Sequence, residues 1–302
     1  FKGEVALYEL IKKVSEKISI YIIHKDKHYK DQVNNNIKGH PNLKELNVYT
    51  FEEPITNFPN VENNHISEAT YYRLYISNYL PKSLNNIVYL DADVVCLNNP
   101  VDEIKHIQKM MKDKYSVGVK TELLRQQGTE SLFKNLEMKN QKYFNAGVMI
   151  IDLNLWKKFN IEELAQTKMV SMASIIRFWD QDILNSIIDG NYLSLDSRLN
   201  YRTSYVDQNK SIKNLTFIHY SGKSKPWDIG GAIEEFSDVY QAYYKDLFEK
   251  EYHLVCRNRK NSINKLFKNL LGLYKHQNLY FYKYLFKSIF VILKKENYHS
   301  LP

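Results

Sequence analysis

Apolar residues along the first fifty positions change from helical spacing to strand spacing and back. Residues 5–14 carry apolar side chains at helical spacing, and Ile18 to Ile23 then follows a strand pattern. The polar segment from His28 to His40 predicts a surface helix, and Leu46 to Phe51 predicts the next strand. This β-α-β order is typical of a parallel sheet in an α/β protein. Because the chain opens on a helix at Phe1 rather than on a strand, we expect a first strand upstream.

The stretch Ile87 to Val95 runs from an apolar strand pattern into two carboxylates, Asp91 and Asp93, one residue apart. Two like charges at the end of a buried strand raise each other's pKa unless a cation lies between them. In open α/β sheets the carboxyl ends of strands are also where ligands bind. This Asp-x-Asp pattern therefore predicts a cation or ligand site, although a turn with two solvated acids fits the stretch equally well.

Predicted helices, strands and loops follow one another as far as residue 205. Ser67 is the expected N-cap of a helix whose Leu74, Tyr75 and Leu80 face inward. The remaining predicted elements are a helix at Val101–Lys112, a strand at Tyr115–Val119, a mobile polar loop at Leu123–Gln141, a strand at Phe144–Asp152, a helix from Trp179, a short strand at Leu193–Leu195 and an irregular loop at Arg198–Tyr205.

Several polar residues at the ends of these elements are candidates for chemistry. Arg73 offers a forked donor for a sugar hydroxyl or a phosphate, and it is otherwise a solvated helix residue. Asn145 precedes Ala-Gly, which permits close approach of a ligand to the backbone or simply a tight bend. Asp180 and Asp182 lie in the first turn of a helix, where the helix dipole favours acids. Capping of the helix explains only one of these acids. The Asp-Gln-Asp segment beside Trp179 also suits the binding of a hydroxyl-rich substrate.

The stretch Thr216 to Trp227 places His219 at the end of a strand, before a turn that contains Gly222 and Lys225. A lone histidine after a strand is most often a satisfied core residue. Here the following turn supplies backbone N–H groups and ammonium charge, which suit a phosphate beside a metal-binding imidazole.

Charge and cysteine content narrow the classes of protein. The net charge is +8, but residues 250–302 hold eleven Lys and Arg against Glu251 and Glu296, which leaves the first 249 residues near neutrality. Cys96 and Cys256 are too few for a thiolate cluster or a disulfide framework, which fits a reducing, cytoplasmic compartment. No signal peptide, membrane span or nucleic-acid recognition motif is visible in the sequence.

Four motifs in sequence order resemble glycosyltransferase family 8, over roughly residues 1 to 230. The similarity is greatest to the bacterial branch that contains the lipopolysaccharide galactosyl- and glucosyltransferases. The resemblance implies a GT-A fold, a Rossmann-like mixed α/β sheet flanked by helices, and retaining transfer of glucose or galactose from a UDP-sugar to a glycan or glycolipid. The motifs are Tyr89-Leu90-Asp91-Ala92-Asp93, Phe144-Asn145-Ala146-Gly147, Asp180-Gln181-Asp182-Ile183-Leu184-Asn185 and His219 to Trp227.

The resemblance also implies roles for single residues. Asp91, Asp93 and His219 would carry Mn²⁺, or Mg²⁺, which neutralises charge on the departing diphosphate. Positions that match donor contacts in the family are Arg73, Asp91, Ala92, Glu122, Asn145, Asp180, Gly222 and Lys225, of which the last two would hold the phosphates. Glu122 departs from the family, where an Asp is more usual.

Gln181 matches the residue on the sugar face opposite the leaving group, with Asp180 and Asp182 beside it as catalytic candidates. Because an amide is a poor nucleophile, we expect front-face return through an oxocarbenium-like state, with a covalent intermediate on Asp182 as the alternative. His65 and Thr70 match a segment that closes over donor and acceptor. The family strand that grips the uridine precedes Phe1, so base recognition lies outside this sequence.

We therefore predict a GT-A domain over residues 1–248 and a basic, aromatic, helical tail over residues 249–302. The tail suits attachment to the inner face of the cell membrane, and packing on the domain is the alternative. Two other functions fit parts of the sequence. The first is a haloacid-dehalogenase-type phosphatase with Asp91 on its nucleophile strand, which leaves His219 to Trp227 without a role. The second is a non-catalytic glycan-binding module.

Overall fold

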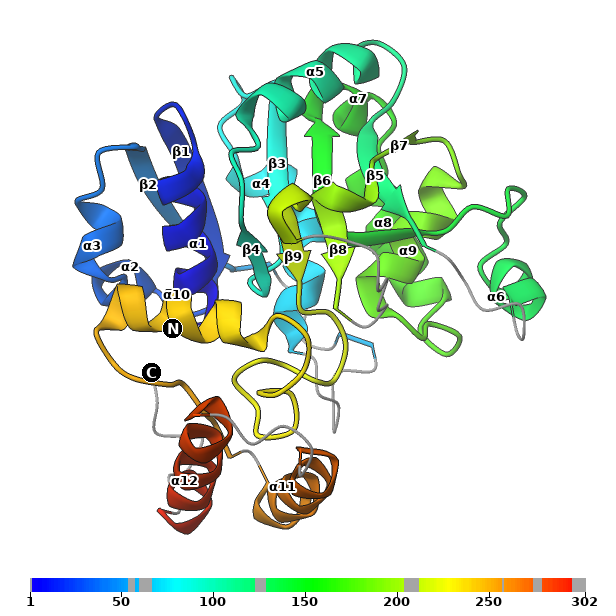
Figure 1. The fold of residues 1–302 in the computed structure, drawn as a ribbon. Coiled ribbons are helices and arrows are strands. Elements are labelled where there is room, and N and C mark those ends of the chain that lie inside the picture. The colour runs from blue at the N-terminus through cyan, green and yellow to red at the C-terminus, as the bar shows by residue number, and fades with distance from the viewer. Residues whose placement is uncertain are drawn as a thin grey trace.

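The structure is a computed structural model that describes residues 2–53, 58–59, 67–122, 129–203, 212–256, 258–273 and 279–294. Strands form the centre of the molecule, and helices pack around them (Figure 1). A hairpin of two helices lies beyond α10 (Ser237–Phe248), on the side of that helix away from the strands.

The N-terminal region is a β-α-β unit as the spacing predicts. It comprises α1 (Lys2–Lys13), β1 (Ile18–His24), α2 (Tyr29–Gln32), α3 (Asn35–Lys38) and β2 (Leu43–Thr50). β1 and β2 pair in parallel over their full length. The single surface helix expected at 28–40 is wrong, because Val33 leaves helical geometry and the Asn34 side chain caps a second helix through the N–H of Asn36.

Within the described ranges, seven further strands form the central part of the fold. β3 (Asn86–Leu90), β6 (Phe144–Asp152), β5 (Val117–Thr121) and β7 (Leu193–Ser194) lie in that order in one sheet, with β6 antiparallel to β3 and β5. β4 (Val94–Cys96), β9 (Phe217–His219) and β8 (Tyr201–Arg202) form the other. Parallel pairs join β5 to β7 and β8 to β9. The mixed α/β architecture predicted from the sequence is confirmed.

Helices flank these strands. Ser67 occupies the N-cap position but makes no side-chain cap hydrogen bond, and the element it precedes begins as a 3₁₀ helix, which corrects the predicted cap. The polar segment expected as a loop contains α6, and its residues 123–128 lie outside the described residues. The flanking helices are η1 (Glu68–Tyr75), α4 (Ile76–Tyr79), α5 (Val101–Met111), α6 (Thr129–Asn135), α7 (Leu153–Lys158), α8 (Ile161–Ser171), α9 (Trp179–Ile188), η2 (Ser197–Asn200) and η3 (Ile212–Asn214).

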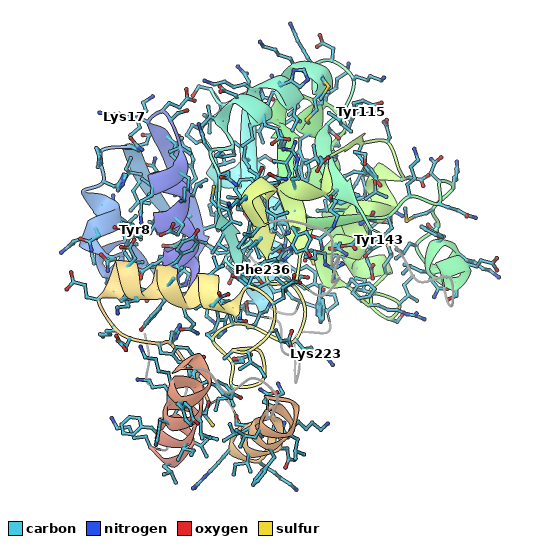
Figure 2. All side chains as sticks on the ribbon, in the orientation of Figure 1. Tyr8, Lys17, Tyr115, Tyr143, Lys223 and Phe236 are labelled. Carbon is cyan, nitrogen blue, oxygen red and sulfur yellow. The ribbon has the colours of Figure 1, made fainter. Side chains whose placement is uncertain are left out.

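The core sits on both faces of β6, whose residues 144–151 are all buried. Near-continuous burial follows from neighbouring strands on both edges and helices on both faces. Leu74 and Tyr75 of η1 and Trp156 of α7 pack into this core. On the other side, Phe236 at the start of α10 lies against the strands, where its carbonyl accepts a hydrogen bond from the Tyr220 hydroxyl (Figure 2).

The C-terminal segment forms α11 (Arg259–Leu273) and α12 (Leu279–Leu293), which pack on the loop after β9. The Tyr284 hydroxyl is buried and donates to the Ile229 carbonyl, and Leu266 is buried beside it. Among the described residues, none of the helices combines the length and the apolar character needed to cross a bilayer. Part of the tail therefore packs on the domain.

The packing of α11 predicts different costs for two leucines on that helix. Leu266→Ala removes a buried side chain and is expected to lower the free energy of unfolding by about 2–5 kcal/mol. Leu271→Ala is the matched control, because that side chain is 82% exposed, and its effect is expected within about 0.5 kcal/mol. Urea denaturation measures both variants, and equal losses would contradict this docking of the tail.

Candidate active site

Asp91 and Asp93 lie in the turn between β3 and β4. The Asp91 N–H donates to the Gly147 carbonyl at 2.8 Å, and the Val94 N–H donates back to the Asp91 carbonyl at 3.0 Å. The Asp93 carbonyl accepts from the Tyr220 N–H at 3.0 Å, just beyond β9. Main-chain bonds from two separate strands therefore fix the position of both acids.

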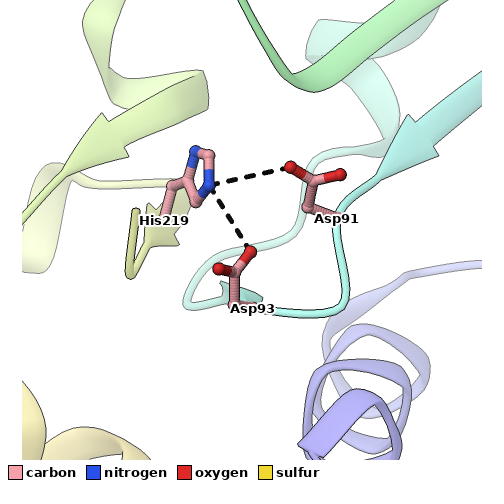
Figure 3. A group of neighbouring side chains, drawn as sticks. All are labelled: Asp91, Asp93 and His219. Atoms are coloured by element: carbon pink, nitrogen blue, oxygen red, sulfur yellow. Dashed lines mark ion pairs between the residues drawn. The ribbon is translucent and has the colours of Figure 1, made fainter. Parts of the chain in front are cut away.

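His219, the last residue of β9, faces the two acids because it pairs with Val94 of β4. Its Nε2 lies 3.4 Å from Asp93 Oδ1 and 3.8 Å from Asp91 Oδ2 (Figure 3). The three candidate ligand atoms lie within 4.8 Å of one another. The structure thus brings together three residues that are up to 128 positions apart in sequence.

The other oxygen of each acid is already engaged, which leaves one oxygen of each facing the imidazole. Asp91 Oδ1 accepts from the Tyr89 hydroxyl at 2.8 Å and lies 2.9 Å from Arg73 Nη2. Asp93 Oδ2 pairs with the Lys225 ammonium. Burial alone would raise the pKa of Asp93, but this ammonium and the neighbouring imidazole outweigh burial and lower it. Two carboxylate oxygens and one imidazole nitrogen fit a divalent cation such as Mn²⁺.

Arg73 lies at the centre of the buried charges. Its guanidinium donates to the Ala146 carbonyl at 2.5 Å and to the Thr70 carbonyl at 3.1 Å. It also pairs with Asp91 on one side and Asp180 on the other. Burial opposes the charged form, but the two carboxylates outweigh burial and raise the pKa of this guanidinium. The solvated alternative for Arg73 is therefore wrong, since the residue is only 6% exposed.

Asp180 is almost fully buried, at 1% exposure. Burial raises its pKa to about 6, although Arg73 and the Thr70 hydroxyl both act to lower it. The Arg73 Nε lies 2.7 Å from Asp180 Oδ2, but its N–H points to the Thr70 carbonyl. The pair is therefore ionic without a directed hydrogen bond, which explains why it does not fully offset burial.

Gln181 points its amide toward the start of β6. Its Oε1 accepts from Asn145 Nδ2 at 3.2 Å and from the Ala146 N–H at 3.1 Å. Its Nε2 donates to the Tyr143 hydroxyl at 3.1 Å. Both ends of the amide are thus held, and Gln181 is fixed beside Asn145.

Asp182 is fully buried and holds the entry to α9. Its Oδ2 accepts from the N–H groups of Arg177 and Phe178, and its Oδ1 accepts from the Tyr143 hydroxyl at 2.5 Å. Trp179, which follows Phe178 and begins α9, has φ +50°. This left-handed conformation costs about 1–2 kcal/mol. The carboxylate of Asp182 therefore stabilises a strained turn that presents Asp180 and Gln181.

Glu122 directly follows β5 and pairs with Arg202 at the end of β8, with 2.5 Å between Oε1 and Nη1. The Arg202 Nε donates to the Ser221 hydroxyl at 2.8 Å. The Glu122 N–H donates to the Tyr143 carbonyl at 2.7 Å, which ties the residue to β6. Glu122 therefore lies on the same side of the sheet as Asn145, with its charge already paired.

The turn after β9 carries the predicted phosphate-binding residues. Gly222 has φ +87° and is exposed, so glycine serves the backbone conformation rather than a lack of space. Lys225 folds back to Asp93 and donates to the Tyr220 carbonyl at 2.6 Å. Ala92 is exposed at the tip of the acidic turn, next to Gly3 of α1.

Of the two predicted lid residues, the Thr70 hydroxyl donates to Asp180 Oδ1 at 2.5 Å, and His65 lies outside the described residues. The sequence interpretation missed Tyr89, Tyr143, Asn200 and Arg202. All four contact predicted site residues. Tyr89 lies in the stretch that leads into Asp91, where it counts only as a strand residue, and the other three lie in no motif that periodicity or turn chemistry singles out.

Residues 3–229 match the sequence model of glycosyl transferase family 8, so the chain belongs to this family. Among relatives, it is 28% identical over 231 residues to a putative glycosyltransferase of Haemophilus influenzae, covering 74% of this chain and 68% of that protein. It is 29% identical over 171 residues to a lipopolysaccharide 1,2-glucosyltransferase of Escherichia coli K12, covering 53% and 49%.

A lipopolysaccharide 1,3-galactosyltransferase of Salmonella typhimurium is 28% identical over 194 residues, covering 61% of this chain and 56% of that enzyme. For these two lipopolysaccharide enzymes, the chain spans about half of their length. Among solved structures, the galactosyltransferase LgtC in complex with donor and acceptor sugar analogues superposes with a TM-score of 0.65 at 22% identity, covering 82% and 92%. An active-site mutant of LgtC gives 0.68 at 21% identity, with the same coverage.

These likenesses confirm the GT-A fold and the predicted family. Membership supports a glycosyl-transfer activity over the phosphatase and glycan-binding alternatives. The geometry agrees, because His219, which the phosphatase interpretation leaves without a role, faces Asp91 and Asp93.

The environment of Asp180 predicts how its carboxyl titrates. Burial holds its pKa at about 6, so the group binds a proton as pH falls through that value. Because the folded-state pKa lies above the ordinary value of 3.8, ionisation of Asp180 lowers stability as pH rises between these values. Thr70→Val removes a hydrogen bond that lowers this pKa, so the midpoint is expected to move to higher pH.

Carboxyl ¹³C shifts in aspartate-labelled, metal-free protein measure this midpoint, and the signal that disappears in Asp180→Asn identifies the residue. Thr167→Val, at an exposed position on α8, is the matched threonine control and is expected to leave the midpoint unchanged. A midpoint that stays in place or falls in Thr70→Val would contradict the assigned role of this hydroxyl.

Proposed function

We propose that the protein is a metal-dependent, retaining hexosyltransferase that moves glucose or galactose from a UDP-sugar to a glycan or glycolipid acceptor. The observation that carries the proposal is the convergence of Asp91, Asp93 and His219, which each offer one candidate ligand atom. Family membership supports the reaction class, and the named relatives that act on lipopolysaccharide support a saccharide acceptor.

In this proposal Asp91, Asp93 and His219 hold Mn²⁺, with Mg²⁺ as an alternative. The bound ion supplies a Lewis acid that neutralises charge on the diphosphate leaving group. Lys225 and the Gly222 turn contribute an ammonium group and backbone N–H groups on the same side, where phosphate oxygens are bound. The ion pair between Lys225 and Asp93 supports this proposal. It places the residue that would bind the diphosphate next to a residue that would bind the metal ion.

The donor hexose is held, in this proposal, by Arg73, Asp180, Asn145 and Glu122. Arg73 and Asp180 are buried and mutually paired, so they present fixed donors and acceptors to sugar hydroxyls. Glu122 is longer than the aspartate usual in the family, and its pairing with Arg202 withdraws its carboxylate toward β8. We infer that the Glu122–Arg202 pair affects whether glucose or galactose fits the site better.

Retention is assigned to front-face return. Gln181 Oε1 accepts two hydrogen bonds, and both Asp182 oxygens accept hydrogen bonds inside the helix entry. These contacts support positioning roles rather than nucleophilic attack. The acceptor hydroxyl forms its bond to the anomeric carbon on the face from which UDP departs, and its proton passes to the departing phosphate oxygen. The Gln181 carbonyl and the Asp180 carboxylate stabilise the oxocarbenium-like state from nearby.

Removal of one ligand tests the metal role. Asp93→Asn is expected to lower transfer from UDP-hexose by about 100-fold or more, because metal stabilisation of a leaving group amounts to several kcal/mol. EDTA is expected to abolish transfer and Mn²⁺ to restore it, as followed by product mass. The matched control Asp102→Asn changes an exposed acid at the start of α5 and is expected to leave the rate unchanged.

Full activity in EDTA would contradict the metal role. Turnover of a phosphoester through a phosphorylated Asp91 would favour the phosphatase alternative. Glycan binding without turnover of any sugar nucleotide would favour the non-catalytic module.

We further propose that α11 and α12 attach the enzyme to an anionic membrane surface, on the cytoplasmic face of the cell membrane. One face of this hairpin packs on the domain, and the other leaves Phe267, Leu271 and Phe286 exposed by 63%, 82% and 71%. The exposed lysines of the hairpin are Lys260, Lys265, Lys268, Lys283 and Lys294. Apolar side chains among lysines suit the interface of an anionic bilayer.

Vesicle binding tests this surface. The triple variant Phe267→Ser, Leu271→Ser, Phe286→Ser is expected to weaken binding to phosphatidylglycerol vesicles at least about tenfold, since each buried apolar side chain contributes about 1.5–3 kcal/mol. Val170→Ser, at a 77% exposed position on α8, is the control. Equal binding of wild type and triple variant, or equal binding to neutral vesicles, would contradict the assignment.

A further inference from the structure

A line of hydrogen bonds with one direction runs from His219 to Asp182 through four other side chains. A carboxylate can only accept hydrogen bonds, so Asp182 fixes the end of this line. The Tyr143 hydroxyl must donate its single hydrogen to Asp182 Oδ1, at 2.5 Å. It then accepts from Gln181, which must therefore present its Nε2 amide group to Tyr143, at 3.1 Å.

Main-chain N–H groups, which only donate, confirm the orientation of the next two amides. The Ala146 N–H donates to Gln181 Oε1, so the carbonyl end of Gln181 faces β6. The Gly147 N–H donates to Asn145 Oδ1 at 3.0 Å, so Asn145 turns its Nδ2 to Gln181. Neither amide can be reversed without placing two donors or two acceptors in contact.

Asn200, the last residue of η2, joins this line to the imidazole. It is fully buried, and its Nδ2 donates to Asn145 Oδ1 at 2.9 Å. Its Oδ1 therefore faces His219 Nδ1, at 3.0 Å. Because a carbonyl oxygen only accepts, Nδ1 must carry the proton. Nε2 is then the ring nitrogen that faces Asp91 and Asp93, and its lone pair can bind a cation that replaces any proton on Nε2.

Packing keeps the imidazole against this carbonyl. A Cβ added to Gly147 would lie 2.2 Å from His219 Cε1 and 2.6 Å from Nδ1, so the ring occupies space that only glycine leaves. His219 is 4% exposed and Asn145 is 6% exposed, which makes an unpaired polar atom costly at either residue. The ring is therefore confined between Gly147 and Asn200.

We propose that Asn200 is a positioning residue that holds His219 in the Nδ1–H tautomer, so that Nε2 is free to bind a divalent cation. Through Asn145, the same side chain ties the imidazole to Gln181, so the cation site and the residue beside the anomeric carbon share one rigid support. The inference rests on the proposed function for the cation and the sugar, whereas the tautomer is a property of the metal-free protein.

Two substitutions separate the two contacts of Asn200. Asn200→Ala removes both, and Mn²⁺ binding measured by titration calorimetry is expected to weaken about 10- to 100-fold, as for other partners of metal-binding imidazoles. Asn200→Asp is isosteric and still accepts from Nδ1, but it cannot donate to Asn145. This variant is expected to keep at least wild-type affinity for Mn²⁺ while transfer falls, because only the link to Gln181 is broken.

The tautomer gives a readout that does not depend on activity. In metal-free protein labelled with ¹⁵N-histidine, the His219 signals, identified by their loss in His219→Gln, are expected to show a protonated Nδ1. Asn200→Asp retains this state, and Asn200→Ala loses it in favour of a mixture with the Nε2–H form. Asn185→Ala is the matched control, since Asn185 is equally buried but its side chain bonds to the main chain of Phe144 and Gln181 and not to the imidazole. It is expected to retain the tautomer and the Mn²⁺ affinity.

A wild-type Nε2–H tautomer would overturn the inference, as would an Asn200→Ala variant with unchanged tautomer and affinity. If Asn200→Ala does not fold, Asn200→Asp decides, because Mn²⁺ binding weakened in that variant would show that the acceptor oxygen is not what matters. Wild-type protein that binds no Mn²⁺ but shows the Nδ1–H form would contradict the proposed metal role and leave the role of Asn200 standing.

Discussion

The site depends on charges that are paired inside the protein rather than in water. Arg73 lies between Asp91 and Asp180, with all three side chains withdrawn from solvent to different degrees. Removing one partner from such a group leaves an uncompensated buried charge, which costs several kcal/mol. The guanidinium therefore holds η1, the acidic turn after β3 and the start of α9 in one arrangement. The predicted sugar-binding groups are fixed before any substrate arrives.

This arrangement links catalysis to the order of the strands. β4 and β9 pair antiparallel, so the acidic turn and His219 meet at one end of the short sheet. β6 crosses the centre of the fold and starts at Phe144, which places Asn145 beside Gln181 and beside Asn200, the residue that bonds to the imidazole. The site is therefore formed where the ends of several separate elements meet, and each contributes only a few side chains. Such rigid support favours preorganised electrostatics over movement during the reaction.

Much of this was accessible from the sequence because strongly patterned segments carry their own signals. The apolar run before Asp91 and the Gly-containing turn after His219 each mark where a strand ends, and the Asn-Ala-Gly step at Asn145 marks where one begins. Asn200 and Tyr143 gave no such signal, because their roles arise only when η2, β6 and α9 come together. Asp182 illustrates the same limit, since its place in the motif suggested chemistry and its contacts assign it to the strained turn at Trp179.

The central claim is that Asp91, Asp93 and His219 bind one divalent cation together. Diffraction from crystals grown with Mn²⁺ and UDP, recorded at the manganese absorption edge, tests it most directly. We expect one anomalous peak at about 2.0–2.3 Å from Asp91 Oδ2, Asp93 Oδ1 and His219 Nε2. A peak elsewhere, or no peak between these three residues with UDP bound, would contradict it.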